Sequence, residues 1–238
     1  MPLKLVHLES DDEFEALVRC EFAAYETPTC KLKELFFPPQ ANREATIQAA
    51  VQRQTAWHRG DPTSQWLKVV DTDDNDKLVG AACWHVYDTD PYAVESDEEC
   101  DWFPKGEERD IGNALMGQFV TPRMTYMRKP HVFLDILFTH PDARRRGAGK
   151  LMMDWGVQQA EERGYEAYID ATDIGRSLYR LYGFIEGEKL QFDMSQFKDT
   201  QRKKELQEIL TPFEWWPMHR PVGGKYEPGK GLLPWEKQ

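Results

Sequence analysis

The chain has 238 residues, of which 40% are hydrophobic and 30% are charged, and its formal net charge is -11. This length suffices for one substantial hydrophobic core, or for a core with a small appendage. The excess of negative charge argues against a general nucleic-acid binder, which needs a basic surface, and no stretch approaches the roughly 18 apolar residues of a membrane span.

The N-terminal part of the sequence predicts the antiparallel start of a sheet, with helices inserted after the first strand. Apolar and polar side chains alternate over residues 3–7, as is typical of a strand. No long apolar stretch occurs at this end of the sequence, so we expect no signal peptide and a cytoplasmic location. Apolar spacing and capping residues then predict three helices and a two-stranded hairpin. The helices are expected at residues 14–23, between Pro28 and Pro38, and at 42–57, and the strands at 66–71 and 78–87.

The four cysteines are Cys20, Cys30, Cys83 and Cys100. Their spacing matches neither a disulfide framework nor a metal-binding motif. We therefore expect reduced thiols and no metal cofactor.

Residues 88–110 are unusually acidic, with ten aspartates and glutamates against one lysine and one arginine. A solvated loop is one interpretation of such a segment, and a lid that faces the substrate and attracts amines is the other. Residues 110–127 are predicted to be helical, with Met116, Phe119 and Val120 pointing inward.

A nearly continuous apolar run at residues 131–138 predicts a central strand buried on both faces, interrupted only by Asp135. Beyond it, Gly147 and Gly149 open a predicted helix that ends at Gly164. A glycine turn at a helix N-terminus exposes backbone N–H groups and the positive end of the helix dipole, which together form a site for a pyrophosphate. The phosphate-binding patterns GxxxxGK[ST] and GxGxxG are both absent here.

The turn, Arg144-x-x-Gly147-x-Gly149, resembles the R/Q-x-x-G-x-G/A motif of the GNAT acetyltransferases. The preceding residues 137–141 resemble the end of the strand that comes before this turn in that family. Residues 165–170 supply the next strand at the expected distance, and residues 178–184 resemble the family's L-Y-x-x-x-G-F signature. The additions to this pattern resemble those of fungal members. The resemblance implies an α/β (α+β) GNAT fold, in which helices flank a mixed, mostly antiparallel sheet with splayed central parallel strands.

The resemblance also implies that acetyl-CoA is the co-substrate. The pyrophosphate would bind to the turn, and the pantetheine and thioester to the strand end. Arg145 stands where the family often has glycine, so its backbone is expected to be restricted. The implied cofactor-binding residues are Leu137, Phe138, Thr139, Arg144, Arg145, Arg146, Gly147, Ala148, Gly149, Lys150, Thr172 and Tyr179.

By the same resemblance Tyr179 would protonate the departing thiolate, while the general base that takes the amine proton is left open. Asp135 is one candidate, because alternation along the strand puts it on the same face as Phe133 and Leu137. If that face lines a cleft, we expect desolvation to raise the pKa of Asp135. A buried aspartate with a purely structural partner is the alternative. His85 on the neighbouring predicted strand is a second candidate base.

The predicted organisation is an acetyltransferase domain at residues 1–194, with an insertion at about 88–130, followed by an extension at 195–238. The domain would close with a strand at 185–194, and the extension would begin with a helix at 200–210. The segment 213–221 is rich in Trp and Pro. We expect it to be an extended arm packed over the domain, with an aromatic pocket wall or a dimer contact as alternatives.

The function predicted from these features is transfer of an acetyl group from acetyl-CoA to a primary amine, by direct attack in a ternary complex. A small-molecule amine is the expected partner, without nucleic acid or membrane, in a monomer or homodimer. Two alternatives stay open: acetylation of a protein or peptide, and a non-catalytic regulatory module that binds acyl-CoA.

Overall fold

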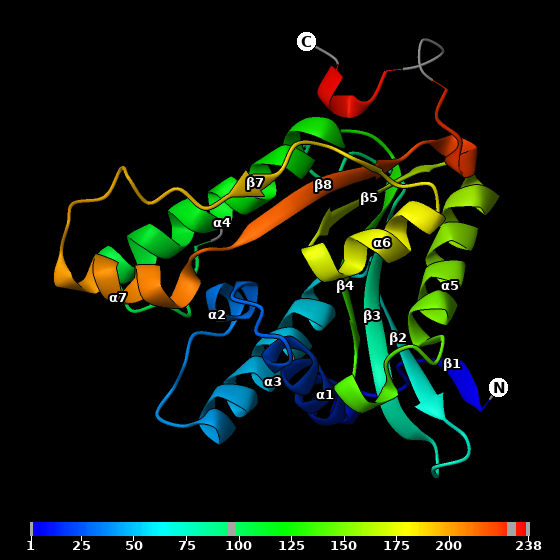
Figure 1. Cartoon of the computed structure of the whole chain (residues 1–238), viewed down its shortest axis with the longest axis horizontal. Helices are drawn as coiled ribbons and strands as arrows, with labels where there is room; N and C mark the ends of the chain where they lie inside the picture. Colours follow the sequence, from blue (N-terminus) through cyan, green and yellow to red (C-terminus); the bar gives the residue numbers. More distant parts are fainter. Residues whose placement is uncertain (1, 95–98, 228–231, 237–238) are drawn as a thin grey trace.

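The computed structural model describes residues 2–94, 99–227 and 232–236. Within these ranges one open sheet runs in the order β1-β2-β3-β4-β5-β8-β6, and β7 pairs separately with β8 (Figure 1). Every neighbouring pair is antiparallel except β4 with β5. The strands are β1 (Leu3–His7), β2 (Ser64–Asp71), β3 (Lys77–Tyr87), β4 (His131–Thr139), β5 (Glu166–Ala171), β6 (Ile185–Glu186), β7 (Leu190–Gln191) and β8 (Glu214–Arg220). The predicted fold class is confirmed.

Helices cover both faces of this sheet. On one face α1 packs against β3 and β4, with α3 behind it, and on the other face α5 packs against the same two strands (Figure 1). No helix in the described ranges is long and apolar enough to cross a membrane. The helices are α1 (Phe14–Glu26), α2 (Leu32–Phe36), α3 (Arg43–Gly60), α4 (Glu107–Tyr126), α5 (Ala148–Arg163), α6 (Asp173–Leu181) and α7 (Gln201–Leu210).

A β-bulge interrupts the central strand β4. Cys83 of β3 pairs with Ile136 and the next residue, Trp84, pairs with Leu134, so Asp135 is an extra residue without an opposite partner. A bulge bends its strand and shifts the alternation of side chains. Accordingly Ile136 packs on the face of α1, whereas Leu137 packs against the core beneath α5.

The prediction that Asp135 and Leu137 share one face of β4 is therefore wrong. Strict alternation holds only for a regular strand, and the bulge places the successive residues Asp135 and Ile136 on the same face, so that Leu137 points to the other. Asp135 still lies on the α1 side of the sheet, opposite the core that Leu134 enters.

The parallel pairing of β4 with β5 ends just before the bulge. Its last pair is Leu134 with Ile169. Beyond this point the two strands separate, and the edge of β4 that faces β5 is unpaired from Asp135 to Thr139. The structure thus contains the splayed central pair that the sequence predicts.

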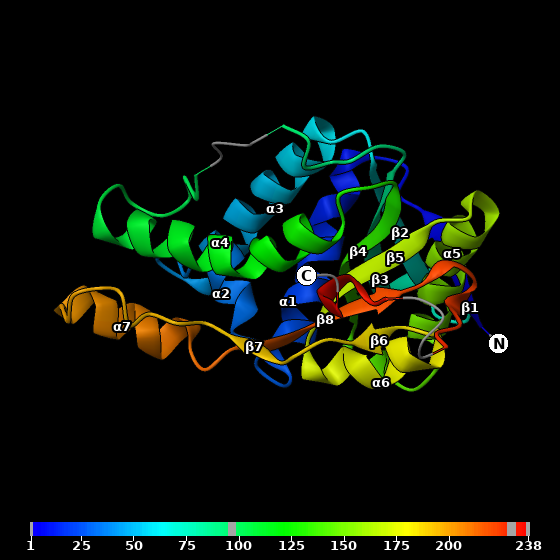
Figure 2. The same ribbon diagram turned by 90° about the horizontal axis from the view of Figure 1, so that it is seen from above.

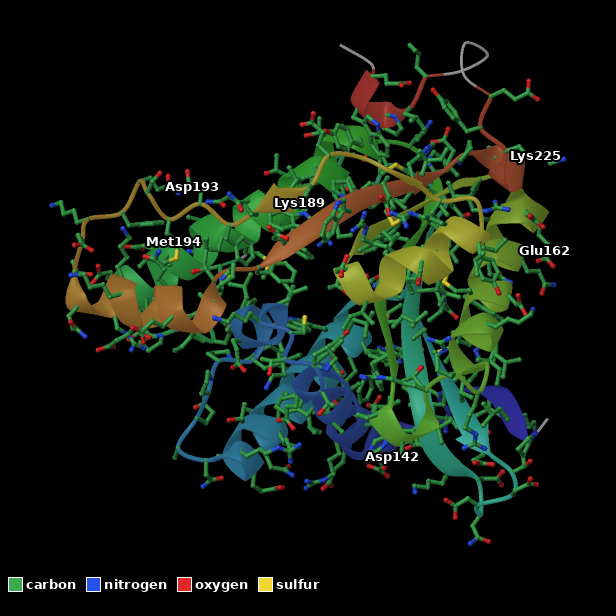
Figure 3. The ribbon with its side chains drawn as sticks, in the orientation of Figure 1. Asp142, Glu162, Lys189, Asp193, Met194 and Lys225 are labelled. Atoms are coloured by element: carbon green, nitrogen blue, oxygen red, sulfur yellow. The ribbon has the colours of Figure 1, made fainter. Side chains whose placement is uncertain are left out.

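A second hydrophobic core lies beside the sheet. It joins α4 to α2, α7, β7 and β8, with Phe119, Phe192, Phe213 and Trp215 at its centre. Figure 2 shows α4 and α7 side by side beyond the edge of the sheet. Figure 3 places Lys189 immediately before β7, and Asp193 and Met194 along the connection that leads from β7 toward α7.

The segment expected to be an arm over the domain is instead a strand of the sheet. β8 lies between β5 and β6 and pairs antiparallel with both. Its backbone provides the hydrogen bonds that a packed arm would leave unmade, and Trp215 and Met218 are fully buried. The single strand predicted at 185–194 is replaced by the short strands β6 and β7. The proposed boundary at residue 194 therefore falls between strands of one sheet.

The acidic segment before α4 is partly packed and partly outside the described residues. Glu95, Asp97 and Glu98 belong to the part that the structure does not describe. Phe103 is buried, and Arg109 donates hydrogen bonds to its carbonyl. The helix predicted at 110–127 is confirmed and begins earlier, at Glu107.

We predict that Gly156→Ala in α5 destabilises the protein by about 1–3 kcal/mol, which is typical of an overpacked core. A Cβ there would lie 2.2 Å from the ring of Trp84, which is fully buried. Gly117 in α4 provides the control, because a Cβ there meets no atom within 4 Å. Urea denaturation should show a loss for Gly156→Ala and no loss for Gly117→Ala. Equal stability of the two variants would contradict the packing assigned to Trp84.

Candidate active site

The turn that joins β4 to α5 has the backbone geometry of an anion site. Gly147 is the N-cap of α5 with a φ of 95°, which favours glycine. The first turn of α5 contains no acidic residue, so its N–H groups and dipole are not compensated by a nearby carboxylate. In Figure 3, Asp142 lies in the connection that leads from β4 to this turn, and Glu162 lies near the C-terminal end of α5.

The three arginines of the turn have different surroundings. Arg144 donates hydrogen bonds to the backbone carbonyls of Ala24 and Thr139, at 2.8 and 3.4 Å, and so ties the turn to α1 and β4. Arg146 forms an ion pair with Asp71 at 2.6 Å. Arg145 is exposed and makes no hydrogen bond or ion pair within the described ranges. Its φ of 63° fits the backbone restriction expected where the family often has glycine.

The remaining predicted cofactor residues lie along the splay, apart from Ala148, Gly149 and Lys150, which lie in the first turn of α5. Leu137 and Thr172 line one cavity there, and Thr172 is the N-cap of α6. Phe138 packs its ring against Tyr25 at 6.3 Å, so only its main chain is available to a ligand in the splay. Lys150 pairs with Asp154 on the exposed side of α5.

The cavity at the splay has a volume of about 100 Å³ and lies between α1, α2, β4 and α6. Carboxyl groups and aromatic rings dominate its lining, which is chemistry suited to an amine. The acidic residues are Glu21, Asp135 and Asp170, and the aromatic residues are Tyr25, Phe36, Phe37, Trp57, Phe119 and Tyr179. The aromatic wall therefore comes from the N-terminal helices, α4 and α6, whereas Trp215 and Trp216 are not among its residues. A larger cavity of about 560 Å³ between α2, α4 and α7 contains none of the predicted site residues.

Tyr179 enters this cavity from α6 and is 6% exposed. Its ring folds back over Gly175, where a Cβ would lie 2.6 Å from the hydroxyl oxygen. Within the described residues the hydroxyl has no hydrogen-bond partner, so it is free to donate to a ligand. Burial raises the pKa of Tyr179 above its ordinary value, and the phenol is protonated at neutral pH.

Asp135 and His85, the two predicted base candidates, lie together. His85 Nε2 is 3.8 Å from Asp135 Oδ2, and His85 Nδ1 is 3.1 Å from Asp61 Oδ2. Burial disfavours the charged imidazolium, but the two flanking carboxylates outweigh it and raise the pKa of His85. The ring also stacks on Tyr87 at 5.5 Å. His85 is thus held as a cation between two carboxylates.

The expected upward shift of Asp135 does not occur. Burial alone would raise the pKa of Asp135, but His85 and Arg123 favour the carboxylate and lower it below the ordinary value. Asp135 is therefore a stabilised anion at the wall of the cavity, with 36% of its side chain exposed.

Asp170 is a site residue that the sequence did not reveal. The last pair between β4 and β5 is Leu134 with Ile169, so Asp135 is the next residue of β4 and Asp170 the next residue of β5. The two carboxyl groups therefore flank the start of the splay. Arg123 of α4 lies 3.3 Å from Asp170 and also covers the ring of Phe133. Burial outweighs Arg123 and raises the pKa of Asp170 to about 6.

Glu21 of α1 is a second carboxyl group that the sequence did not reveal. It is 1% exposed and accepts a hydrogen bond of 2.5 Å from Gln54. Burial raises the pKa of Glu21 to about 8, so the group is largely protonated at neutral pH. Helical periodicity placed residues 14, 17, 18 and 22 inward, and Glu21 lies on the same buried face, which is the signal that could have identified it.

Comparisons with known proteins agree with this geometry. The sequence pattern of the Acetyltransferase (GNAT) family matches residues 30–184. No curated protein matches the chain.

Solved structures with a similar fold share little sequence with this chain. The histone acetyltransferase HPA2 and related acetyltransferase from Corynebacterium glutamicum is 16% identical over 96% of this chain and 99% of that one, with a TM-score of 0.59. The polyamine N-acetyltransferase of Drosophila melanogaster is 14% identical over 91% and 97%, with a TM-score of 0.60. The C-terminal condensation domain of Ebony, in complex with β-alanyl-dopamine, is 14% identical over 92% and 99%, with a TM-score of 0.61. At such identities the likeness shows a shared fold.

We predict that Glu21→Gln removes a loss of stability at alkaline pH. The pKa of Glu21 is raised from 4.5 to about 8 in the folded chain. The contribution of Glu21 to stability is therefore complete at a pH below its pKa in the unfolded chain, and it is lost as the pH rises through its pKa of about 8 in the folded chain. At about 1.4 kcal/mol per pKa unit, the variant should exceed the parent by roughly 3–5 kcal/mol at pH 9 and by little at pH 4.

Urea denaturation across this pH range measures the difference. Glu15→Gln is the control, since Glu15 is an exposed residue of the same helix, and it should change stability by no more than about 0.5 kcal/mol at any pH. A difference between Glu21→Gln and the parent that does not grow with pH would contradict the assignment.

Proposed function

The chain belongs to the GNAT family of acetyltransferases, and we propose that it transfers an acetyl group from acetyl-CoA to the primary amine of a small molecule. The observation that carries this proposal is the meeting of three groups at one cavity. The phenol of Tyr179 and the carboxylates of Asp135 and Asp170 surround the splay of β4 and β5, next to the anion-binding turn. This arrangement supplies an acid, a base and a place for a cationic acceptor.

The residues at the turn and splay fit acetyl-CoA. The N-terminus of α5 offers N–H groups without a competing carboxylate, as a pyrophosphate requires. Exposed Arg145 adds a positive charge beside it. The unpaired edge from Leu137 to Thr139 offers main-chain hydrogen bonds to the pantetheine and thioester, and an N–H there would stabilise an oxyanion. The co-substrate supplies the activated acetyl group, and the protein supplies position and proton transfer.

Tyr179 is the proposed general acid. Its hydroxyl faces the cavity and keeps its proton at neutral pH, so it can donate that proton to the thiolate that leaves. Gly175 makes this possible, because any side chain there would displace the phenol. A regulatory module that only binds acyl-CoA has no need for such a group, and Tyr179 therefore favours the enzyme over that alternative.

Asp135 and His85 are proposed to act on the acceptor rather than as a simple base. His85 holds Asp135 as a carboxylate, and this anion faces the cavity where an ammonium group would bind. Asp170 is the better proton acceptor, because a pKa of about 6 leaves it ionised at neutral pH and yet basic enough to receive a proton. The amine, once neutral, attacks the thioester carbonyl directly.

A small acceptor is favoured over a peptide by the enclosure of the cavity. Phe36 of α2 with the adjoining Phe37, Trp57 of α3 and Phe119 of α4 surround it, so an extended chain would find no open groove there. Two proteins of similar fold are named for small amines or contain one, the polyamine N-acetyltransferase and the Ebony domain with β-alanyl-dopamine.

We predict that Tyr179→Phe lowers kcat by about 10²–10⁴-fold, the usual contribution of a general acid. Affinity for acetyl-CoA should be unchanged, because the ring and its packing remain. Steady-state kinetics with pooled small amines, together with calorimetric binding of CoA, measure both quantities. Tyr182→Phe is the matched control, since that hydroxyl bonds Asp154 on the outer surface. An unchanged kcat in Tyr179→Phe would rule out the acid assignment.

We predict that kcat/KM of the parent rises with pH through about 6, as Asp170 loses its proton and becomes able to act as a base. Asp170→Asn should abolish this rise and lower the plateau by about 10²–10⁴-fold. Asp173→Asn, which alters an exposed aspartate of α6, should leave the pH profile of kcat/KM intact. Asp135→Asn tests acceptor binding instead of proton transfer, and it should mainly raise KM for the amine. If the rise near pH 6 persists in Asp170→Asn, the base lies elsewhere.

A further inference from the structure

Beneath the cavity, three side chains direct different donor atoms toward one point. Cys83 and His85 lie two residues apart on β3 and face α1, and Asp135 reaches them from the bulge of β4. His85 Nε2 is 3.6 Å from Cys83 Sγ and 3.8 Å from Asp135 Oδ2, and all three donor atoms lie within 4.8 Å of one another. Cys83 and His85 are buried.

The separation between Cys83 and His85 fits both a sulfur hydrogen bond and one edge of a metal coordination shell, and the separation between His85 and Asp135 is longer than a hydrogen bond. An N–H···O hydrogen bond spans about 2.7–3.2 Å between heavy atoms, so 3.8 Å between His85 and Asp135 is too long for one. Around a tetrahedral zinc ion with bonds of about 2.3 Å to sulfur and 2.0–2.1 Å to nitrogen, sulfur and nitrogen lie about 3.6 Å apart. The observed distance between Cys83 and His85 is that length.

A second observation supports a metal ligand at His85. Its other ring nitrogen, Nδ1, lies 3.1 Å from the carboxylate of Asp61 and 3.1 Å from the hydroxyl of Thr63. Histidines that ligate a metal through one nitrogen commonly donate the other N–H to a carboxylate, which fixes the ring and its tautomer. Asp61 therefore leaves His85 Nε2 aimed at the point that Cys83 and Asp135 share, where a bound cation would displace the Nε2 proton of the imidazolium.

We propose that Cys83, His85 and Asp135 form a site for a thiophilic divalent cation such as Zn²⁺. A thiolate, an imidazole and a carboxylate suit zinc, whereas magnesium and calcium prefer oxygen ligands alone. Three protein ligands leave a fourth position for water. Asp135 is the ligand on the cavity side, so a bound cation engages the same carboxylate that faces the acceptor. The existence of the site does not depend on the proposed function; its effect on the acceptor does.

The sequence gives no sign of this site, because its ligands have no recognised spacing. Cys83-x-His85 is too short for a zinc motif, and Asp135 follows 50 residues later in the chain. Only the pairing of β3 with β4 and the bulge at Asp135 bring the three together.

Cobalt provides a spectroscopic probe of the site in the full chain, treated with a chelator beforehand. We expect one Co²⁺ per chain, a near-ultraviolet charge-transfer band from the thiolate, and displacement by Zn²⁺. Cys83→Ala should abolish the band, and Cys20→Ala, which removes another buried cysteine of the same cluster, should keep it. Asp61→Asn should weaken Co²⁺ binding by roughly 10–100-fold while the band persists at saturation.

Absence of the band in the folded parent, or its survival in Cys83→Ala, would overturn the proposal. Circular dichroism checks that each variant folds. Should Cys83→Ala fail to fold, His85→Gln provides the same comparison, since an amide replaces the imidazole ligand. Acetyl transfer measured with and without Zn²⁺ is a separate readout. A rise in KM for the amine in the presence of Zn²⁺ supports engagement of Asp135. A cobalt band in a chain without transferase activity would confirm the metal site and contradict the proposed function.

Discussion

The bulge at Asp135 is the constraint on which the functional geometry depends. By inserting one residue into β4, it bends the strand away from β5 immediately after their last pair, Leu134 with Ile169. The bend leaves the edge of β4 unpaired from Asp135 to Thr139, and it turns a carboxylate toward His85 in an otherwise apolar strand. One irregularity in backbone pairing thus shapes both the splay of the central strands and the carboxylate wall of the cavity.

Two segments that contain none of the three family motifs, residues 88–130 and 195–238, pack against each other. Residues 88–130 supply α4 and residues 195–238 supply α7 and β8, and the apolar faces of these elements meet in the second core around Phe119 and Trp215. Leu35 of α2 completes this core. The consequence reaches the site, because Phe119 also lines the cavity and Arg123, one turn further along α4, pairs with Asp170.

Whereas the fold class followed from the resemblance to the GNAT family, local patterns in the sequence were sufficient for nearly all helices and for the turn at Gly147. Each of these rests on residues close together in the chain, where spacing and capping determine the structure. The remainder depends on pairings between distant residues. Arg123 and Asp170 are 47 positions apart, and the bulge at Asp135 leaves no mark in composition. Periodicity likewise could not show that residues 214–220 insert between β5 and β6, since any alternating apolar segment fits a sheet edge as well as an interior position.

The position of β8 affects how the chain can fold as it leaves the ribosome. β5 is complete at Ala171, but its partner begins 43 positions later, at Glu214. Until then the backbone of β5 presents an unsatisfied edge, which is a template for wrong pairing with other chains. Nascent chains that pause before β8 emerges should therefore be the species most prone to aggregate and most dependent on chaperones. The last strand to be synthesised protects one of the central strands of the sheet.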